Sequence, residues 1–396
     1  MSTLITFLGR GKAQDGGYRK ACYHFADGQK RETAYFGLAL ADVTNATTVR
    51  ILGTSGSMWD ALILEQGDTQ GEDERWESLA NAVAADQVDQ PMLNAVEQML
   101  NQNDQRKFEL RLIPYGIKDD EQVAILLAIT QNLPQDQGII LDITHALRHL
   151  PMLGLLSVFY LRAVTKIDIE AIYYGALEQT QDNLTPVLRL DGLLKLYEWI
   201  RALENFNKDG DYGAFQSLFN SEKLPGNLLA EAAFLERVAN ASLGSQKLNT
   251  AMQQIDQGKQ ISAAGALFLP LLKQRTEWRK GGDRAQRERR LAIDYLARAD
   301  YLRAAQFGYE SFISAETRGD LNEYESRKEA DSFLSDKGKL LPLESPENFS
   351  TFKNLRNALA HGTMDSSQGR SAAFIKTLIN KENDLRKWLE KALRQT

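Results

Sequence analysis

The stretch "GIILDITHALRHLPM", residues 138–152, decides the fold class of the first half of this chain. It opens with a short, uninterrupted apolar run, which is typical of a strand buried on both faces of a parallel sheet. The run gives way to polar residues and then to an apolar helical pattern at 149–164. A strand that ends in a polar loop and leads into a helix is the repeating unit of a doubly wound α/β sheet.

The same unit recurs as far as about residue 190. Besides 138–145, strands are expected at 4–9, 47–54, 108–116 and 167–178. Helical patterns separate them, at 58–66, 74–102, 119–132 and 149–164. Asp27-Gly28 lies between two alternating runs and indicates a hairpin insertion near 18–42. Residues 1–190 are therefore predicted to form a Rossmann-like, mostly parallel sheet domain.

From residue 191 to residue 396 the strand signal fades. Apolar residues recur there at spacings of three and four, which predicts helices. No repeat of 20 to 50 residues is visible, so a solenoid is not expected. The fold class is thus α/β followed by all-α, in two domains, which suits a chain of 396 residues.

Composition limits the classes of function. Apolar residues make up 43% of the chain and charged residues 25%, as in ordinary globular proteins. The longest apolar run, 150–161, is interrupted by Pro151 and Gly154 and is too short to span a membrane. No export signal is recognised, and the single cysteine, Cys22, cannot form an intramolecular disulfide. A cytoplasmic protein without a membrane partner is expected.

The net charge of −6 argues against a protein that coats nucleic acid indiscriminately. The most basic local stretch is 275–303, which has nine Arg or Lys residues against five Asp or Glu residues. It is either a nucleic-acid-binding patch or a solvated helix face with ion pairs four residues apart.

Ligands of doubly wound sheets bind beyond the carboxyl ends of the strands. Glycines, hydroxyls and basic groups follow the expected strands here, and this combination suits a ligand that carries phosphates. The candidate ligand-binding residues are Gly9, Arg10, Gly11, Gly53, Thr54, Ser55, Gly56, Ser57, Thr144, His145, Arg148 and Gly175. The loop "GRGKAQDGG" matches neither the dinucleotide fingerprint nor the P-loop, so neither fold is expected.

Alternative roles remain open for the histidines of this region. His145 and His149 suit ligand contact about as well as helix capping or plain solvent exposure. Asp142 and His145 would suit a metal, but no second cluster of ligating residues accompanies them, and no metal site is predicted.

Four segments, in order, carry a family resemblance: "LGRGK" (8–12), "LGTSGSMW" (52–59), "DITHALRHLPM" (142–152) and "YYGALE" (173–178). Followed by a helical half, they resemble the CRISPR-associated Rossmann fold (CARF) joined to a HEPN domain, the architecture of auxiliary ribonucleases of type III CRISPR systems. The resemblance implies an antiviral endoribonuclease that is activated by a cyclic oligoadenylate, with cyclic tetra-adenylate favoured. It also implies a ligand at the two-fold axis of a homodimer, or of a higher oligomer, and a single-stranded RNA substrate.

The stretch "FKNLRNALAHG", residues 352–362, matches the ribonuclease motif of that family at Arg356, Asn357 and His361. RNA supplies its own nucleophile, the 2′-OH, so the protein needs only to orient it, move a proton and stabilise charge. A histidine exchanges protons near neutral pH, and an arginine grips phosphate oxygens. These three residues are the predicted catalytic set, Asn357 as a hydrogen-bond partner of the His361 ring, and no metal or other cofactor is expected.

One helix is expected from about 346 to 361, with Ser345-Pro346 at its start and Gly362 past its end. Its buried stripe would be Phe352, Leu355 and Leu359. On an ideal helix, Arg356 and His361 point about 140° apart, which favours a site made by two facing chains.

Three functions fit these patterns. The first is a ligand-activated ribonuclease. The second is a cyclic-nucleotide sensor whose helical half only dimerises, because an Arg and a His five positions apart also occur by chance. The third is an enzyme that degrades the cyclic oligoadenylate itself, with Thr144 and His145 near the ring phosphates.

Overall fold

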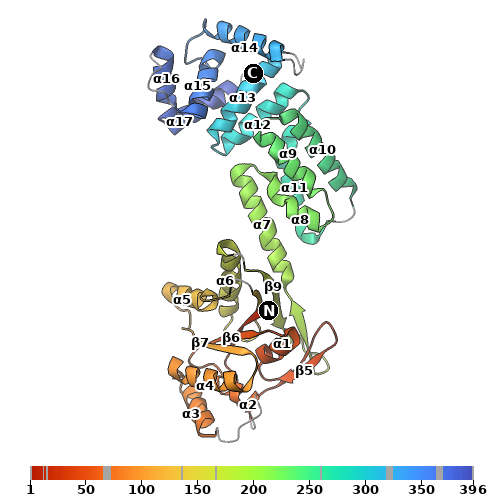
Figure 1. Ribbon diagram of the computed structural model, residues 1–396, viewed down its shortest axis with the longest axis vertical. Helices are drawn as coiled ribbons and strands as arrows, with labels where there is room; N and C mark the ends of the chain where they lie inside the picture. Colours follow the sequence, from red (N-terminus) through yellow and green to blue (C-terminus); the bar gives the residue numbers. More distant parts are fainter. Residues whose placement is uncertain are drawn as a thin grey trace. The chain divides into compact units, whose positions relative to one another are not determined.

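The computed structural model describes residues 2–11, 13–14, 17–65, 73–134, 137–165, 167–258, 261–317, 324–362 and 369–394. The chain divides into two compact units, Met1–Leu194 and Lys195–Thr396 (Figure 1). The fold class is α/β followed by all-α, as predicted. No helix in the described ranges is long and apolar enough to cross a membrane.

The first unit is built on a sheet with the strand order β5-β4-β10-β9-β8-β1-β6-β7. The strands are β1 (Ser2–Leu8), β4 (Ala21–His24), β5 (Lys30–Thr33), β6 (Thr48–Gly53), β7 (Lys107–Leu112), β8 (Gly138–Asp142), β9 (Ile169–Gly175) and β10 (Leu184–Arg189). A separate short hairpin joins β2 (Ala13–Gln14) to β3 (Gly17–Tyr18). The run from β9 through β8, β1 and β6 to β7 is entirely parallel. The carboxyl ends of these five strands therefore meet at one edge.

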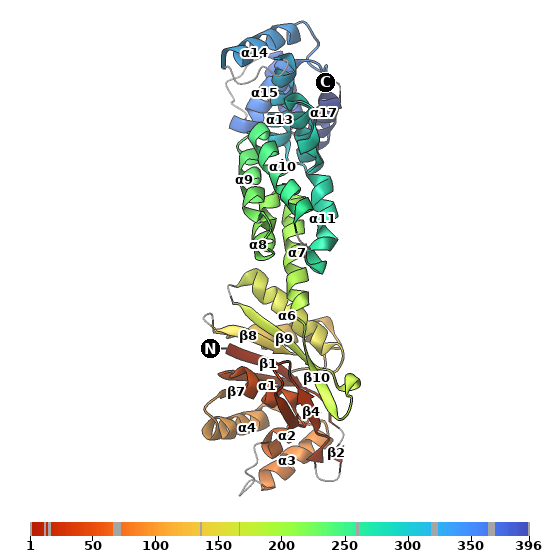
Figure 2. The ribbon, with the colours of Figure 1, turned by 90° about the vertical axis from the view of Figure 1, so that its right-hand side faces the viewer.

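Helices cover both faces of this sheet (Figure 2). One face packs against α1 (Phe36–Thr44), α2 (Ala61–Glu65), α3 (Asp73–Ala84) and α4 (Gln90–Asn103). The other face packs against α5 (Asp119–Thr130) and α6 (Leu150–Val164). Alternation along β1 divides the two cores, since Leu4 and Leu8 point to the first and Ile5 and Phe7 to the second. This is the predicted doubly wound arrangement.

The hairpin at Asp27-Gly28 is present as the antiparallel pair β4–β5, with Gly28 at φ 88°. It belongs to the main sheet, because β4 pairs with β10. Strand β10 was not predicted. It contains Pro186, which weakens a strand pattern, but it lies between β4 and β9 in the sheet.

The single helix expected over 74–102 is two helices, α3 and α4. The break is at residues 85–89, where Asp86 has a left-handed backbone (φ 58°) and Asp89 caps α4 through the Met92 amide. Pro91 in the first turn of α4 fits this new start, because proline suits the first turn of a helix.

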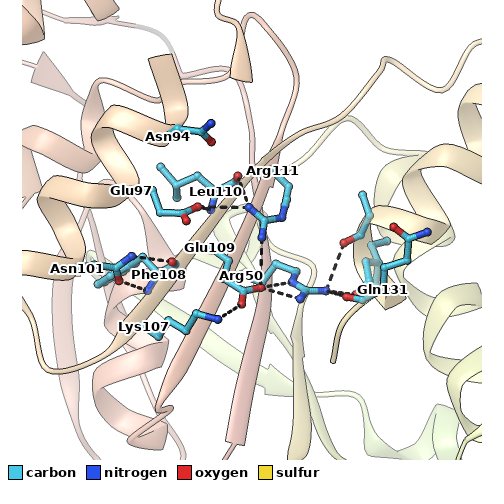
Figure 3. Close-up of polar contacts among 12 residues, drawn as sticks. Arg50, Asn94, Glu97, Asn101, Lys107, Phe108, Glu109, Leu110, Arg111 and Gln131 are labelled. Carbon is cyan, nitrogen blue, oxygen red and sulfur yellow. Dashed lines mark hydrogen bonds and ion pairs between the residues drawn. The ribbon is translucent and has the colours of Figure 1, made fainter. Parts of the chain in front are cut away.

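A buried ion pair ties β6 and β7 to α5 (Figure 3). Arg50 of β6 is 2% exposed and binds Glu109 of β7 at 2.6 Å. Its Nη1 also donates to the carbonyls of Ala128, Ile129 and Gln131 at the end of α5. Burial alone would raise the pKa of Glu109, but Lys107 and Arg50 hold that pKa below its usual value. One guanidinium thus satisfies a carboxylate and the orphan carbonyls of a helix end.

Replacing Arg50 by Met should lower the free energy of unfolding by about 3–5 kcal/mol, because it removes one partner of a buried pair. Urea unfolding monitored by circular dichroism measures the loss. Arg111→Met is the matched control: Arg111 lies on β7 but is 39% exposed, and it should cost less than about 1 kcal/mol. Equal losses in the two variants would contradict the role assigned to Arg50.

The second unit consists of helices around one large core. They are α7 (Asp191–Asp209, which begins in the first unit), α8 (Gln216–Ser221), α9 (Gly226–Arg237), α10 (Ala241–Gln257), α11 (Ala263–Arg275), α12 (Arg284–Ala297), α13 (Tyr301–Glu316), α14 (Tyr324–Gly338), α15 (Phe349–His361), α16 (Arg370–Ile379) and α17 (Glu382–Arg394). Helix α13 packs against α12, α14, α15 and α17. It is the central support of the helix that carries the predicted catalytic residues.

Candidate functional site

The loops that follow the parallel strands lie against one another at the carboxyl edge of the sheet. The Met58 amide, after β6, donates to the Gly9 carbonyl, after β1, at 3.0 Å. A Cβ on Gly9 would lie 3.4 Å from the Ala146 nitrogen, after β8. The Thr144 hydroxyl accepts from the amide of Gly175, the last residue of β9, at 2.7 Å. The predicted ligand-binding loops therefore form one continuous rim.

Asp86 is the centre of a polar cluster at this rim. Arg10 Nη2 donates to Asp86 Oδ2 at 2.6 Å, and Ser55 Oγ donates to Oδ1 at 2.6 Å. Tyr115, which follows β7, donates its hydroxyl to Oδ1 at 2.5 Å and accepts from Arg10 at 2.7 Å. The hydrogen bonds from Ser55, Tyr115 and Arg10 lower the pKa of Asp86. Three donors from three strand-end loops thus converge on one carboxylate.

The cluster is open to solvent, since the side chains of Arg10 and Asp86 are 53% and 41% exposed. Gly56 lies directly against it: a Cβ there would come within 2.4 Å of Arg10 and 2.7 Å of Asp86. The glycine allows the loop after β6 to approach the charged pair closely.

Other predicted ligand residues serve the loop itself. Thr54 and Ser57 are 3% and 2% exposed. Ser57 Oγ donates to the Leu8 carbonyl at 2.6 Å and accepts from the Thr54 amide at 2.9 Å. Gly53 lies against the Trp59 ring, and Gly11 against Tyr18 and Met58, with no room for a Cβ. In the structure these residues shape the loops of the rim.

Behind the rim, Asp142 is buried and His145 is partly buried. Asp142 accepts from Thr6 Oγ1 at 2.7 Å and from the Thr144 amide at 2.8 Å, and burial raises its pKa to about 6. His145 Nε2 accepts from the Phe36 amide at 3.2 Å, and burial lowers the pKa of His145 to about 4. His145 is therefore a neutral acceptor at pH 7 that anchors the start of α1.

Arg148 and His149 lie at the surface. Arg148 lies near enough to Glu178 to lower the pKa of that carboxyl, after the larger effect of Tyr174. His149 is bonded through Nε2 to the Tyr115 carbonyl at 2.7 Å. His149 thus holds the loop that supplies Tyr115 to the Asp86 cluster.

Replacing His145 by Gln keeps an acceptor for the Phe36 amide but removes the titration. Because the folded pKa of His145 is about 4, below the usual 6.5, its contribution to stability is lost as pH falls from 6.5 towards 4. As the pH falls over that range, the free energy of unfolding of the variant should therefore rise relative to that of the wild type, by up to about 3 kcal/mol. Urea unfolding at pH 4.5, 5.5, 6.5 and 7.5 measures the difference. If the free energies of unfolding of the two proteins changed in parallel with pH, His145 would not be neutral in the folded protein.

Helix α15 carries the predicted catalytic residues, but it begins later than expected. Its cap is Asn348, which accepts from the Thr351 amide at 3.0 Å and donates to the carbonyls of Leu341 and Pro342. Ser345-Pro346 lies outside the helix, so the expected start at 346 is wrong: the buried amide of Asn348 satisfies more backbone groups there. Gly362 ends the helix at φ 78°, as expected.

The buried side of α15 holds Phe349, Phe352 and Leu355, whereas Leu359 is only partly buried. The Phe352 ring lies 5.4 Å from Phe312 of α13 and 5.6 Å from Trp388 of α17, centroid to centroid. A Cβ on Gly308 would come within 2.6 Å of Phe352. The close approach of α13 and α15 depends on this glycine.

Arg356 is held by an aromatic ring. Its guanidinium lies 4.2 Å from the centroid of Tyr309 on α13. The Tyr309 hydroxyl donates to Asp331 of α14 at 2.7 Å, and Lys353 pairs with the same carboxylate. Burial raises the pKa of Tyr309, and the hydrogen bond to Asp331 raises it further. Tyr309 and Asp331 thus position Arg356, and no sequence pattern pointed to either residue.

Asn357 is half-buried and His361 is exposed. Within the described ranges no hydrogen bond joins them, so the expected contact between Asn357 and the His361 ring is absent. Since α15 is helical throughout 349–361, Arg356 and His361 keep the divergence of about 140° that an ideal helix gives them.

The geometry defines a class: a doubly wound sheet with a polar rim at its carboxyl edge, followed along the chain by a helical unit. Residues 3–178 match the family model described as "CRISPR system endoribonuclease Csx1, CARF domain". The family model ends before the Arg356–His361 motif.

Two relatives are similar over longer ranges. The CRISPR-associated protein MJ1674 of Methanocaldococcus jannaschii is 24% identical over 245 residues, 56% of this chain and 39% of that protein. The chain thus spans well under half the length of this relative. The solved structure of Enterococcus italicus Csm6 bound to cyclic hexa-2′-fluoro-hexa-dAMP is similar with a TM-score of 0.38 and 12% identity, over 100% of this chain and 95% of that chain. Residues 3–178 are thus similar to a CARF domain, and the chain is similar over 245 residues to a CRISPR-associated protein.

Proposed function

We propose that this protein is an endoribonuclease of type III CRISPR defence, activated by a cyclic oligoadenylate, that cuts single-stranded RNA without a metal. The sensor would be the sheet domain, residues 1–190 of the predicted division, and the effector the helical domain, residues 191–396. The observation that carries the sensor is the convergence of Arg10, Ser55 and Tyr115 on the Asp86 carboxylate at the carboxyl edge of a CARF-type sheet.

The donors of the Asp86 cluster suit a phosphodiester. An arginine and two hydroxyls provide charge-assisted hydrogen bonds to an anion, and all three now serve a carboxylate that carries the same unit charge. A phosphate of the ligand would take the place of Asp86, and the carboxylate would move into solvent. Asp86 thus tunes affinity, because every ligand must displace it.

Asp86→Ala should tighten binding of a cyclic oligoadenylate by about tenfold, since the competing carboxylate is removed, and Arg10→Ala should weaken it by tenfold or more. Isothermal titration with cyclic tri-, tetra- and hexa-adenylate measures both effects and selects the ring size. Asp89→Ala is the matched control: Asp89 is the neighbouring carboxylate that caps α4 and should leave affinity unchanged. Weaker binding by Asp86→Ala would mean that Asp86 organises the ligand site instead of competing for it.

The proposed cleavage uses the residues of α15. Arg356, fixed over Tyr309, would bind the scissile phosphate, and His361 would exchange the proton of the 2′-OH or of the leaving 5′-oxygen. Asn357 lies on the His361 side of the helix and would contact the substrate. Because Arg356 and His361 diverge on one helix, the proposed site needs two copies of α15, and hence a homodimer.

His361→Ala should abolish ligand-stimulated cleavage, with a loss of roughly 10²–10⁴-fold for a proton-transfer group, while ligand affinity is retained. Wild-type cleavage should persist in EDTA and leave 2′,3′-cyclic phosphate ends, which mass spectrometry of the RNA fragments identifies. His24→Ala, at an exposed histidine of the hairpin, is the control and should cleave normally. If His361→Ala still cleaved RNA, His361 would not be catalytic, and a sensor in which Arg356 and His361 form no catalytic motif would be favoured. Products with 5′-phosphate ends would refute the mechanism.

The third function, degradation of the ligand by Thr144 and His145, is less well supported. His145 is neutral and accepts from the Phe36 amide, and the Thr144 hydroxyl accepts from the Gly175 amide. Both side chains are already engaged in joining loops of the rim.

A further inference from the structure

A groove of about 860 Å³ crosses the helical unit, away from α15 in sequence. It is bounded by the end of α7, the end of α11, the turn at Glu277–Lys280 and one face of α12. Three arginines line it: Arg275 of α11, and Arg290 and Arg298 of α12. A groove of this size holds a ligand of small-molecule dimensions or a nucleotide.

The three arginines differ from others of the same unit. Arg237, Arg303 and Arg386 each pair with a carboxylate within 4 Å. In the described part of the unit, none of the three groove arginines makes such an ion pair. Their positive charges therefore remain available to a ligand.

Aromatic rings hold two of these guanidinium groups in place. Arg275 and Arg298 lie 5.8 Å and 5.5 Å from the centroid of the buried Phe206 ring. Arg290 is fixed differently, by a hydrogen bond of 3.4 Å from Nη1 to the Glu277 carbonyl. Orienting the groups before binding reduces the entropy lost when a ligand binds.

Asp294 lies among the arginines on α12, four residues after Arg290 and four before Arg298. Burial raises the pKa of its carboxyl, whereas Arg298, Arg275 and Arg290 lower it. Counting Glu277, the groove holds three positive and two negative groups, and so keeps a net positive charge in a chain of net charge −6. Exposed Leu271 and Ile293 add an apolar wall.

Cationic groups beside an apolar wall suit single-stranded nucleic acid, whose phosphates bind arginine and whose bases pack on apolar or aromatic surfaces. We propose that the Arg275–Arg290–Arg298 groove binds the single-stranded RNA substrate at a distance from the cleavage motif. This inference rests on the proposed function, because that function supplies the RNA. Helix α12, which carries two of the arginines, packs on α13, and α13 packs on α15. The groove and the motif thus share one support.

The test is equilibrium binding of a fluorescent 20-nucleotide single-stranded RNA to the full chain, followed by anisotropy at several salt concentrations. The double variant Arg290→Ala/Arg298→Ala should bind at least tenfold more weakly. The slope of log affinity against log salt should fall by about 1.4, because each lost phosphate contact removes roughly 0.7. The matched control is Arg237→Ala/Arg386→Ala, which removes two exposed, ion-paired arginines and should keep the wild-type slope.

Cleavage is measured in parallel to separate the two hypotheses. If RNA binding depends on the groove but neither the wild type nor any variant cleaves the RNA, this inference stands and the proposed function is refuted. If both double variants lost RNA affinity equally, or if neither lost any, the groove would not be the RNA-binding site. An acidic peptide that binds the groove and excludes RNA would overturn it as well, because the ligand would then be a protein segment.

Discussion

The parallel pairing of β1 with both β6 and β8 is the constraint on which the first unit depends. Strand β1 is hydrogen-bonded on both sides and buried along its whole length. In a parallel sheet the strands run in one direction, so their carboxyl ends reach the same edge. Residues separated by more than 130 positions, such as Arg10 and Thr144, therefore belong to one rim.

The rim shows how burial divides residues of similar chemistry. Ser55 and Ser57 are two positions apart, yet Ser55 donates to an exposed carboxylate while Ser57 is 2% exposed and bonds Leu8 and Thr54 within the rim. His145 and His149 differ in the same way, as one is partly buried and the other exposed. Residue type alone suggested that the two members of each pair have the same role. Their different solvent exposure shows that they do not share the same contacts.

The arginine of the proposed cleavage motif and two arginines of the proposed groove lie near aromatic rings of the helical unit. Tyr309 holds Arg356, and Phe206 holds Arg275 and Arg298. A guanidinium over a ring keeps its hydrogen-bonding edges open, unlike one in a bidentate ion pair. Both places suit phosphate recognition, and they make up the two parts of the proposed RNA path.

The sequence by itself determined the fold class, the five parallel strands, the hairpin at Asp27-Gly28 and the helix around Arg356, because local apolar periodicity and turn residues specify these elements. It also pointed to Arg10 and Ser55, since strand-end loops follow from strand positions.

Only the tertiary structure decided that Asp86 joins them. Asp86 lies in a break within a pattern that predicts one helix, and Tyr115 reaches it from another strand. Such contacts between distant residues depend on packing, which local periodicity does not encode. The roles of Tyr309 and of the groove around Arg290 have the same origin: they arise where helices distant in sequence meet.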